Sequence, residues 1–369
     1  MRWFLLFLTI LAVILFLGCT AEEKKEVKIG VLIPKTGEFS SAGVVMENAA
    51  KLAEKHAKEI FGINVKIIIA DCGDKPETTK AAFMSLSQQG VVAVVGAYSS
   101  PQSLIAADTA KELKLVYIAS VASADLEGKV KEGNRYVFRN AYNTTYWGVL
   151  ATEFLEISNA SSYYLIGFDP LRTFNTALFN YVKNNTKAEF KGEAWYKSPS
   201  IAPEDYKKAV ASAIASGAEV VILGDPGPTS VSVVREFAMR SGKATIYSVG
   251  GTLALPYVLK NLSVNNVAFQ AAAIEGQEKT NLTKRYFEDY RSIFKEDANN
   301  YAGILTYDAI MIVAQAASKG DLVEQLEKGS FIGAAGIYSF DENHQAKWGS
   351  EKLKGSLGIF RDGKIEILR

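Results

Sequence analysis

Short apolar runs alternate with longer amphipathic stretches from about residue 27 to residue 249. The short runs are rich in Val, Ile and Leu, which is typical of strands buried in a parallel sheet. Strands separated by helices of this length require right-handed crossovers. The predicted strands are 27–33, 65–70, 92–95, 115–119, 163–168, 193–196, 219–223 and 245–249, and the predicted helices include 74–89, 146–157, 174–184, 205–216, 230–241 and two that end near residues 60 and 113.

The alternation occurs twice, with a change of domain at about residues 136–139. Two α/β units in series predict two lobes with a cleft between them, and such sheets bind ligands at the carboxyl ends of their strands. A strand of small residues at 267–273 suits a crossover between the lobes, and helices are expected at 282–294 and 301–318. Near the end, Asp362-Gly363 between two apolar runs predicts a tight hairpin turn.

The stretch from Val92 to Pro101 carries the strongest local signal for a site. A buried strand ends at Gly96 and is followed by Ser99, Ser100 and Pro101. Ser100 before Pro101 is predicted to cap a helix. The backbone N–H groups of residues 102 and 103, with the two serine hydroxyls, would then face outward and favour a carboxylate or another small anion. A plain capped helix without a ligand remains the alternative.

The composition excludes several other classes of function. The chain has 369 residues, 48% of them hydrophobic, with 41 basic and 40 acidic residues and a net charge of +1, so it is large enough for two domains. It has no basic stripe, which argues against a nucleic-acid partner. His56 and His344 are isolated, and with two cysteines they predict neither a zinc site nor a Ser-His-Asp triad. We expect no metal and no cofactor.

The N-terminus predicts export from the cytoplasm. Arg2 precedes an apolar run at residues 3–17 that is short for a bilayer span but suits a signal peptide. The run ends in Phe16-Leu17-Gly18-Cys19, which resembles the lipobox of prokaryotic lipoproteins. The resemblance implies that Cys19 is lipidated and anchors the protein to the outer face of the cell membrane. The alternative is a buried N-terminal helix. With Cys19 acylated, Cys72 has no partner and is expected to be a small buried residue.

A series of short motifs follows in a fixed order from residue 27 to the end. They are Lys28-Ile29-Gly30-Val31-Leu32-Ile33-Pro34 with Thr36-Gly37, Val95-Gly96 with its serines, Asn299-Asn300-Tyr301 with Tyr307-Asp308-Ala309, Phe340-Asp341-Glu342-Asn343, and Asp362-Gly363-Lys364. Together with the lipobox they resemble the type I periplasmic binding proteins. Within that group the branch that matches best is the leucine/isoleucine/valine-type solute receptors of ABC transporters.

This resemblance implies an α/β fold of two Rossmann-like lobes with parallel sheets, joined by three crossovers that close on a small ligand. The implied division of the chain is a signal peptide at 1–18 and a lipidated tether at 19–26. Lobe 1 is then formed by 27–140 and 272–336, and lobe 2 by 141–271 and 337–369.

The resemblance also implies ligand-binding residues. In that family a serine four residues after the strand-ending glycine binds the ligand carboxylate, and Ser100 matches it. The loop after the next strand supplies main-chain groups and a hydroxyl, which match Val121 and Ser123. An aromatic residue of the second lobe covers the ligand, and Phe174 matches it. The complete candidate set is Tyr98, Ser99, Ser100, Val121, Ala122, Ser123, Phe174, Asp225, Gly251 and Tyr301.

The acidic residue that would receive an amino acid's ammonium group is missing at the expected place. Gly250-Gly251-Thr252 holds no acid. Asp225 is the candidate substitute, although it is equally suited to cap the turn from Asp225 to Pro228. Tyr98, Tyr142 and Tyr301 are expected either in the cleft or in the core.

These features predict an extracytoplasmic receptor of an ABC importer. It would clamp a small carboxylate-bearing solute, either a branched-chain or other amino acid or an amide, and deliver it to membrane permease subunits. The alternative is a ligand-sensing lipoprotein of a signalling system. An enzyme is not expected, because no Gly-X-Ser-X-Gly, Gly-X-Gly-X-X-Gly or phosphate-loop motif is present.

Overall fold

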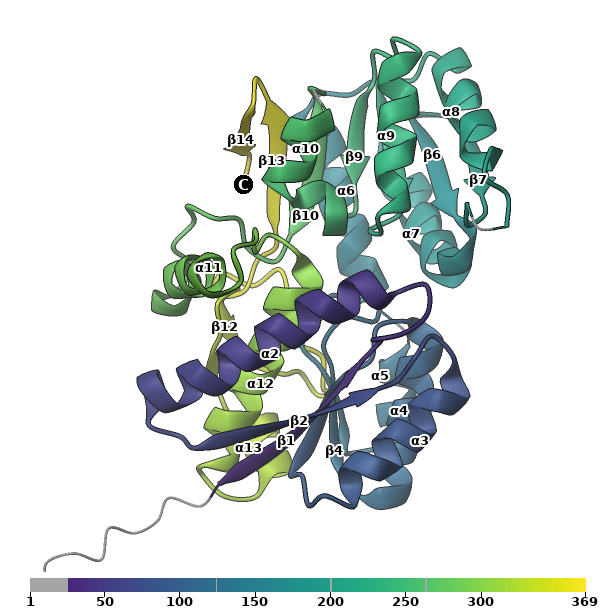
Figure 1. Ribbon diagram of the computed structural model, residues 1–369. Coiled ribbons are helices and arrows are strands. Elements are labelled where there is room, and N and C mark those ends of the chain that lie inside the picture. Colours follow the sequence, from purple (N-terminus) through teal and green to yellow (C-terminus); the bar gives the residue numbers. More distant parts are fainter. Residues whose placement is uncertain (1–25, 124, 200, 263) are drawn as a thin grey trace, which may run out of the picture.

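A computed structural model describes residues 26–123, 125–199, 201–262 and 264–369. The predictions for Cys19 and for the signal peptide lie outside these residues. Within them the chain forms two α/β lobes, one below and one above in Figure 1. None of the helices in these ranges combines the length and the apolar character that crossing a membrane requires.

The lower lobe is built on a parallel sheet with the strand order β2-β1-β3-β4-β5. Alternate residues pack on opposite faces: Val31 and Val95 face α2 and α12, whereas Leu32 and Val94 face α3 and α4. Both faces are covered, and this explains the continuous apolar runs in the sequence. The elements are β1 (Val27–Ile33), α2 (Ser40–Phe61), β2 (Val65–Asp71), α3 (Pro76–Ser87), β3 (Ala93–Gly96), α4 (Ser100–Leu113), β4 (Val116–Ala119), α5 (Leu126–Lys131) and β5 (Val137–Arg139).

The upper lobe is built on a larger sheet with the order β14-β13-β10-β9-β8-β6-β7. Its strands run parallel from β10 to β7, and β13 and β14 add an antiparallel edge. The elements are α6 (Thr144–Ile157), β6 (Ser162–Phe168), η1 (Asp169–Leu171), α7 (Arg172–Asn185), β7 (Glu189–Tyr196), α8 (Asp205–Ala215), β8 (Val220–Gly224), α9 (Thr229–Met239), β9 (Thr245–Ser248), η2 (Gly251–Ala254), α10 (Pro256–Leu262), β10 (Val267–Ala271), β13 (Ser356–Arg361) and β14 (Lys364–Ile367).

The described chain passes between the lobes at three places, as expected. It leaves the lower sheet after β5, returns after β10, and leaves again after the small hairpin of β11 and β12. The segment between the last two crossings packs on the lower lobe. It consists of α11 (Asn281–Phe294), α12 (Tyr301–Ala317), α13 (Leu322–Lys328), β11 (Phe331–Ile332) and β12 (Ile337–Tyr338). The residue boundaries proposed for the two lobes stay a prediction.

Two local predictions are confirmed. Asp362 and Gly363 both have positive φ, 47° and 76°, and Arg361 pairs with Lys364, as in a two-residue hairpin turn. Cys72 is buried, and burial raises the pKa of its thiol to about 12, so the thiol stays protonated and unreactive. Sequence analysis missed α5, α10 and α13, because six or seven residues are too few for a helical period to stand out.

Candidate functional site

The candidate site is a cavity between the two lobes with a volume of about 40 Å³. Its walls come from the loops that follow β3, β4, β8 and β9, and from α4, α6, η1, α7 and α12. It therefore lies at the carboxyl ends of strands of both sheets, where α/β sheets bind ligands. Its lining residues are Tyr98, Ser99, Ser100, Val121, Ala122, Ser123, Trp147, Leu171, Phe174, Pro226, Val249 and Tyr301.

Most of the residues proposed from the sequence meet in this cavity, although their contact with a ligand stays a prediction. Two of the ten do not line it. Asp225 lines an adjoining hollow of about 40 Å³, which shares Tyr98, Leu171 and Pro226 with the first. Gly251 packs against Pro226 and does not line the cavity: a Cβ atom on Gly251 would stand 2.1 Å from the Pro226 carbonyl oxygen. Sequence analysis missed Trp147, Leu171, Pro226 and Val249.

A sharp turn after β3 directs residues 98–100 toward the cavity. Gly96 has a φ of 113°, and a Cβ atom there would lie 2.2 Å from the Leu32 carbonyl oxygen, so only glycine fits. Ala97 follows with a φ of 55°, which is uncommon for a residue with a side chain and costs about 1 kcal/mol or more. Such strain is typical of functional loops.

The start of α4 differs from the prediction in two respects. Ser99, and not Ser100, occupies the N-cap, and Gln102 completes the cap by accepting from the Ser99 backbone N–H at 3.0 Å and from the Ser99 hydroxyl at 3.1 Å. The Ser103 N–H donates to the Ser99 carbonyl at 3.0 Å, so it is not available to an anion. Ser100 is half-buried, and its hydroxyl has no partner within the described chain.

The loop after β4 provides a second hydroxyl. Ser123 lines the cavity, and its hydroxyl likewise has no partner among the described residues, whereas its carbonyl accepts from the Thr144 hydroxyl at 2.9 Å. Ser120 lies on the same loop, but its hydroxyl is bonded to that of Thr306 at 3.0 Å. Ser100 and Ser123 are therefore the two serines of this edge whose hydroxyls remain open to a ligand.

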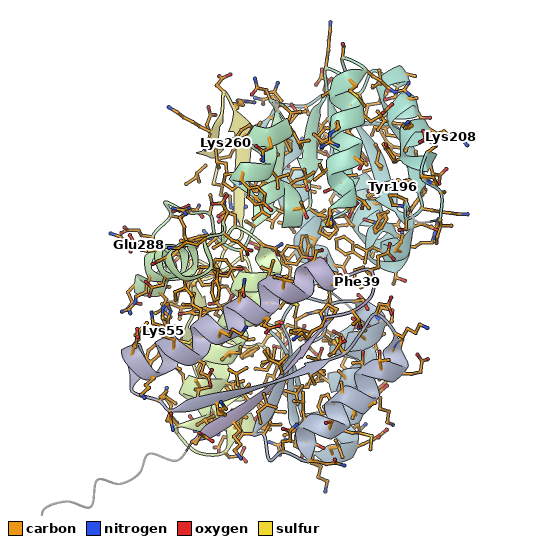
Figure 2. All side chains as sticks on the ribbon, in the orientation of Figure 1. Phe39, Lys55, Tyr196, Lys208, Lys260 and Glu288 are labelled. Atoms are coloured by element: carbon orange, nitrogen blue, oxygen red, sulfur yellow. The ribbon has the colours of Figure 1, made fainter. Side chains whose placement is uncertain are left out.

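Aromatic rings form much of the remaining wall. The Trp147 ring meets Phe174 at 5.4 Å and Tyr301 at 5.2 Å, both edge to face. Burial raises the pKa of Tyr98 to about 12, and Tyr301 interacts with it. Phe39 packs on Tyr98 at 4.9 Å, and Figure 2 shows Phe39 at the end of α2 that faces the upper lobe. Tyr142 belongs to the core, where Trp348 packs on it at 4.5 Å.

The described residues that line the cavity and its adjoining hollow include no Lys, Arg or His, and the two carboxyl groups there are Asp225 and Glu38. Asp225 is fully buried and caps its turn: Gly227 N–H donates to Oδ1 at 2.7 Å, and the hydroxyls of Tyr196 and Thr229 donate to Oδ2. Burial raises the pKa of Asp225 to about 6, and the charge of Glu38 acts in the same direction.

A larger groove of about 710 Å³ lies at the opposite pole of the lower lobe. It is lined by residues 26–27, 61–64, 92, 315 and 317–319, at the amino ends of β1, β2 and β3. Ligands of parallel sheets bind at the carboxyl ends, so its size alone does not make this groove the site.

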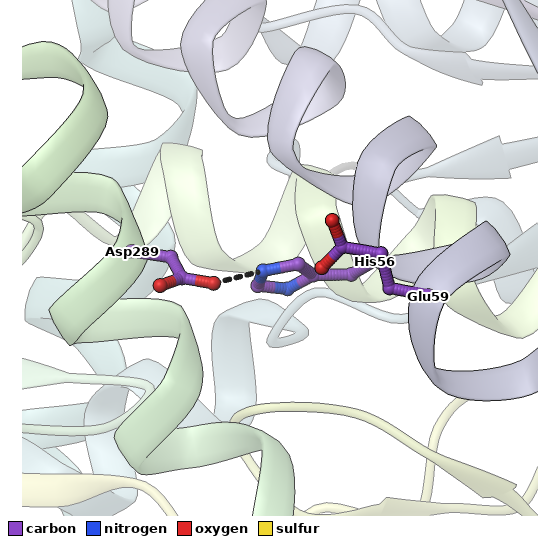
Figure 3. Close-up of side chains that lie close together, drawn as sticks. All are labelled: His56, Glu59 and Asp289. Atoms are coloured by element: carbon purple, nitrogen blue, oxygen red, sulfur yellow. Dashed lines mark hydrogen bonds and ion pairs between the residues drawn. The ribbon is translucent and has the colours of Figure 1, made fainter.

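His56, Glu59 and Asp289 form the cluster of potential metal ligands that the described residues contain (Figure 3), with ligand atoms within 4.8 Å of one another. His56 Nε2 bonds Asp289 Oδ2 at 2.8 Å, and Nδ1 bonds the Tyr307 hydroxyl at 2.8 Å. Arg285 bonds Glu59 at 2.6 Å and Asp289 at 3.1 Å. The Arg285 guanidinium already neutralises the two carboxylates. The bonds of the cluster therefore connect α2 to α11 and α12.

A family model described as "Periplasmic binding protein" matches residues 26–348. A curated relative, Leu/Ile/Val-binding protein homolog 1 of Brucella melitensis, is 22% identical over 344 residues and 89% of each chain. The amino acid binding protein of Pseudomonas aeruginosa is 25% identical over 249 residues, covering 66% of this chain and 65% of that one.

Solved structures share the fold. The branched-chain amino acid transporter substrate-binding protein LivJ of Streptococcus pneumoniae, in complex with isoleucine, has a TM-score of 0.77 at 18% identity and covers 93% of this chain and 98% of its own. A solute-binding protein of an ABC transporter from R. palustris, in complex with benzoate, has a TM-score of 0.77 at 13% identity and covers 93% and 96%.

Proposed function

Because this chain belongs to the periplasmic binding protein family, whose model matches residues 26–348, we propose that it captures a small carboxylate-bearing solute for an ABC importer. Proteins of this family bind solutes outside the cytoplasm. The single observation that carries the proposal is the cavity between the lobes, into which open the hydroxyls of Ser100, at the start of α4, and of Ser123, on the loop after β4. We further propose that the protein is a receptor without catalytic activity.

The carboxylate is the part of the solute that the proposal specifies best. Isoleucine and benzoate, the ligands of two structural neighbours, share a carboxylate and an apolar body. In this chain Ser100 and Ser123 offer hydroxyl donors, and the N-terminal end of the α4 dipole favours negative charge. Aromatic and aliphatic side chains would enclose the apolar body, with Phe174 of the upper lobe covering it.

An amino acid also needs a partner for its ammonium group, and Asp225 is our candidate. Its Oδ1 accepts one hydrogen bond, from Gly227, so it keeps capacity for a second donor. The sequence left open whether Asp225 caps its turn or binds the ammonium group. In this proposal it does both. The names of the curated relatives, Leu/Ile/Val-binding and amino acid binding, support a ligand of this class.

Binding and closure are coupled in this proposal. A solute that first contacts Ser100 and Ser123 on the lower lobe gains the contacts of Phe174 and Pro226 only when the upper lobe closes over it. The solute therefore stabilises the closed state by its differential affinity, and the permease recognises that state.

The proposal also includes a lipid anchor at Cys19 that holds the receptor near its permease. Its support is the lipobox-like sequence Phe16-Leu17-Gly18-Cys19 alone. Each buried CH₂ group of an acyl chain contributes about 0.8 kcal/mol, so two or more chains would retain the protein at the membrane surface.

A thermal-shift panel tests the function directly. We expect at least one amino acid, amide or small carboxylate to raise the melting temperature, because a ligand at a hundred times its Kd stabilises the folded state by about 2.7 kcal/mol. Nucleotides, sugars and metal ions serve as controls and should leave the melting temperature unchanged. A response confined to those controls would contradict the proposal.

The Asp225 carboxyl gives the site a pH dependence. Binding an ammonium group favours the ionised carboxylate, whose pKa burial raises to about 6. As the pH falls from about 7 to about 5, protonation of Asp225 should weaken the binding of a zwitterionic amino acid roughly tenfold. Titration calorimetry at both pH values measures the effect, and Asp225→Asn should bind weakly at both. Equal affinity at the two pH values would remove Asp225 from the ammonium site.

A further inference from the structure

One residue in the wall of the cavity carries a hydrogen-bond donor that no described residue satisfies. Trp147 lies in the first turn of α6, where the chain has just entered the upper lobe, and only 3% of its surface is exposed. Its indole Nε1 is buried and has no acceptor within the described chain. Several other buried polar atoms lack a partner, but Trp147 is the residue among them that lines the candidate site.

The other tryptophans in the described part of the chain have acceptors. Trp348 Nε1 donates to the Asn140 carbonyl at 2.7 Å, and Trp195 Nε1 donates to Glu193 Oε1 at 3.3 Å. An indole nitrogen donates and cannot accept, so only an acceptor can satisfy it. Buried donors in native proteins are seldom left without one, and an orphaned donor therefore calls for an explanation.

The ring of Trp147 is held in place by its neighbours. Tyr142 meets it edge to face at 5.1 Å, and Phe174 and Tyr301 do the same at 5.4 and 5.2 Å. These rings come from the first crossing, the upper lobe and α12. A ring fixed from three sides in the wall of a ligand cavity is suited to select ligands, since it has little freedom to find another partner.

We propose that a bound solute supplies the missing acceptor to Trp147 Nε1–H. The inference rests on the proposed function and narrows its ligand class to solutes that carry, besides the carboxylate, an uncharged acceptor such as an amide or hydroxyl oxygen. A purely aliphatic side chain leaves the donor unsatisfied. A second carboxylate finds no Lys, Arg or His among the described residues that line the cavity and the adjoining hollow.

Two pairs of amino acids with nearly equal shape test this preference. Asparagine and leucine differ by an amide group in place of an isopropyl group, and threonine and valine by a hydroxyl in place of one methyl. We expect the acceptor-bearing member to bind about ten- to hundredfold more tightly to the native protein. In Trp147→Phe, which keeps an aromatic ring without the donor, the ratio of the two affinities within each pair should fall toward one.

The chemical shifts of the indole N–H groups provide a second test. If Trp147 had only a structural role, ligand binding would not shift its Nε1–H signal. In a ¹⁵N–¹H correlation spectrum, binding of asparagine should shift the Trp147 Nε1–H signal downfield, while the signal of Trp348, whose donor is already bonded, should change little. If leucine or valine binds as tightly as its partner and the Trp147 signal stays in place, the inference is wrong while the proposed function stands. If none of the four amino acids binds, the inference is wrong, whereas the proposed function is decided by the wider thermal-shift panel of amino acids, amides and small carboxylates.

Discussion

Replacing Asp308 with alanine is expected to lower the free energy of unfolding by about 3–5 kcal/mol. The carboxyl group is fully buried on α12 and accepts from the N–H groups of Ala334 and Ala335, at 2.5 and 2.9 Å, and from the Tyr338 hydroxyl at 2.8 Å. Truncation would leave three buried donors without an acceptor. Those donors lie next to the third crossing, so the change should also loosen the connection between the lobes.

Denaturant unfolding followed by circular dichroism measures the loss. The matched control is Asp321→Ala, because Asp321 is an exposed N-cap of α13 that accepts one N–H, from Glu324, at 2.9 Å. That variant should lose only about 1 kcal/mol. If Asp308→Ala loses no more than Asp321→Ala, the buried network does not contribute as described.

Ser100→Ala is expected to weaken binding of the best ligand about ten- to hundredfold, because it removes a hydrogen bond to a charged carboxylate. The hydroxyl of Ser100 has no partner within the described chain, so the melting temperature of the ligand-free variant should equal that of the native protein. Titration calorimetry on both proteins checks the two expectations separately.

The control is Ser120→Ala at the same edge of the sheet. The Ser120 hydroxyl is bonded to Thr306 and does not line the cavity, so this variant should lose some stability but keep its affinity. Unchanged affinity in Ser100→Ala would place the carboxylate elsewhere.

Much of the fold follows from the sequence because its strands are covered on both faces. Val31 and Leu32 are both fully buried, although they point to opposite sides of the sheet, and such strands appear as unbroken apolar runs. The antiparallel hairpin of β13 and β14 could also be predicted from the sequence, since Asp362-Gly363 favours positive φ at both positions. The short helices α5, α10 and α13 are stabilised by tertiary packing, and their sequences show no clear helical period.

Only part of the site could be predicted from the sequence, for a related reason. Ser99, Ser100 and Ser123 lie four or five residues after the ends of the predicted strands 92–95 and 115–119, so the rule that ligands bind at strand carboxyl ends leads to them. Trp147 and Leu171 reach the same cavity from the other lobe, and no local pattern distinguishes them from core residues. The N-cap was assigned one residue too late because Pro101 suits the first helical position, yet here it occupies the second.

The most direct measurement is a crystal structure of the protein purified gently with the solute it retains. We expect a small molecule between the lobes, with its carboxylate within hydrogen-bond distance of the Ser100 and Ser123 hydroxyls and with Phe174 against its apolar part. A solute bound instead in the groove at residues 61–64 and 315–319, or one whose carboxylate lies away from Ser100, would contradict it.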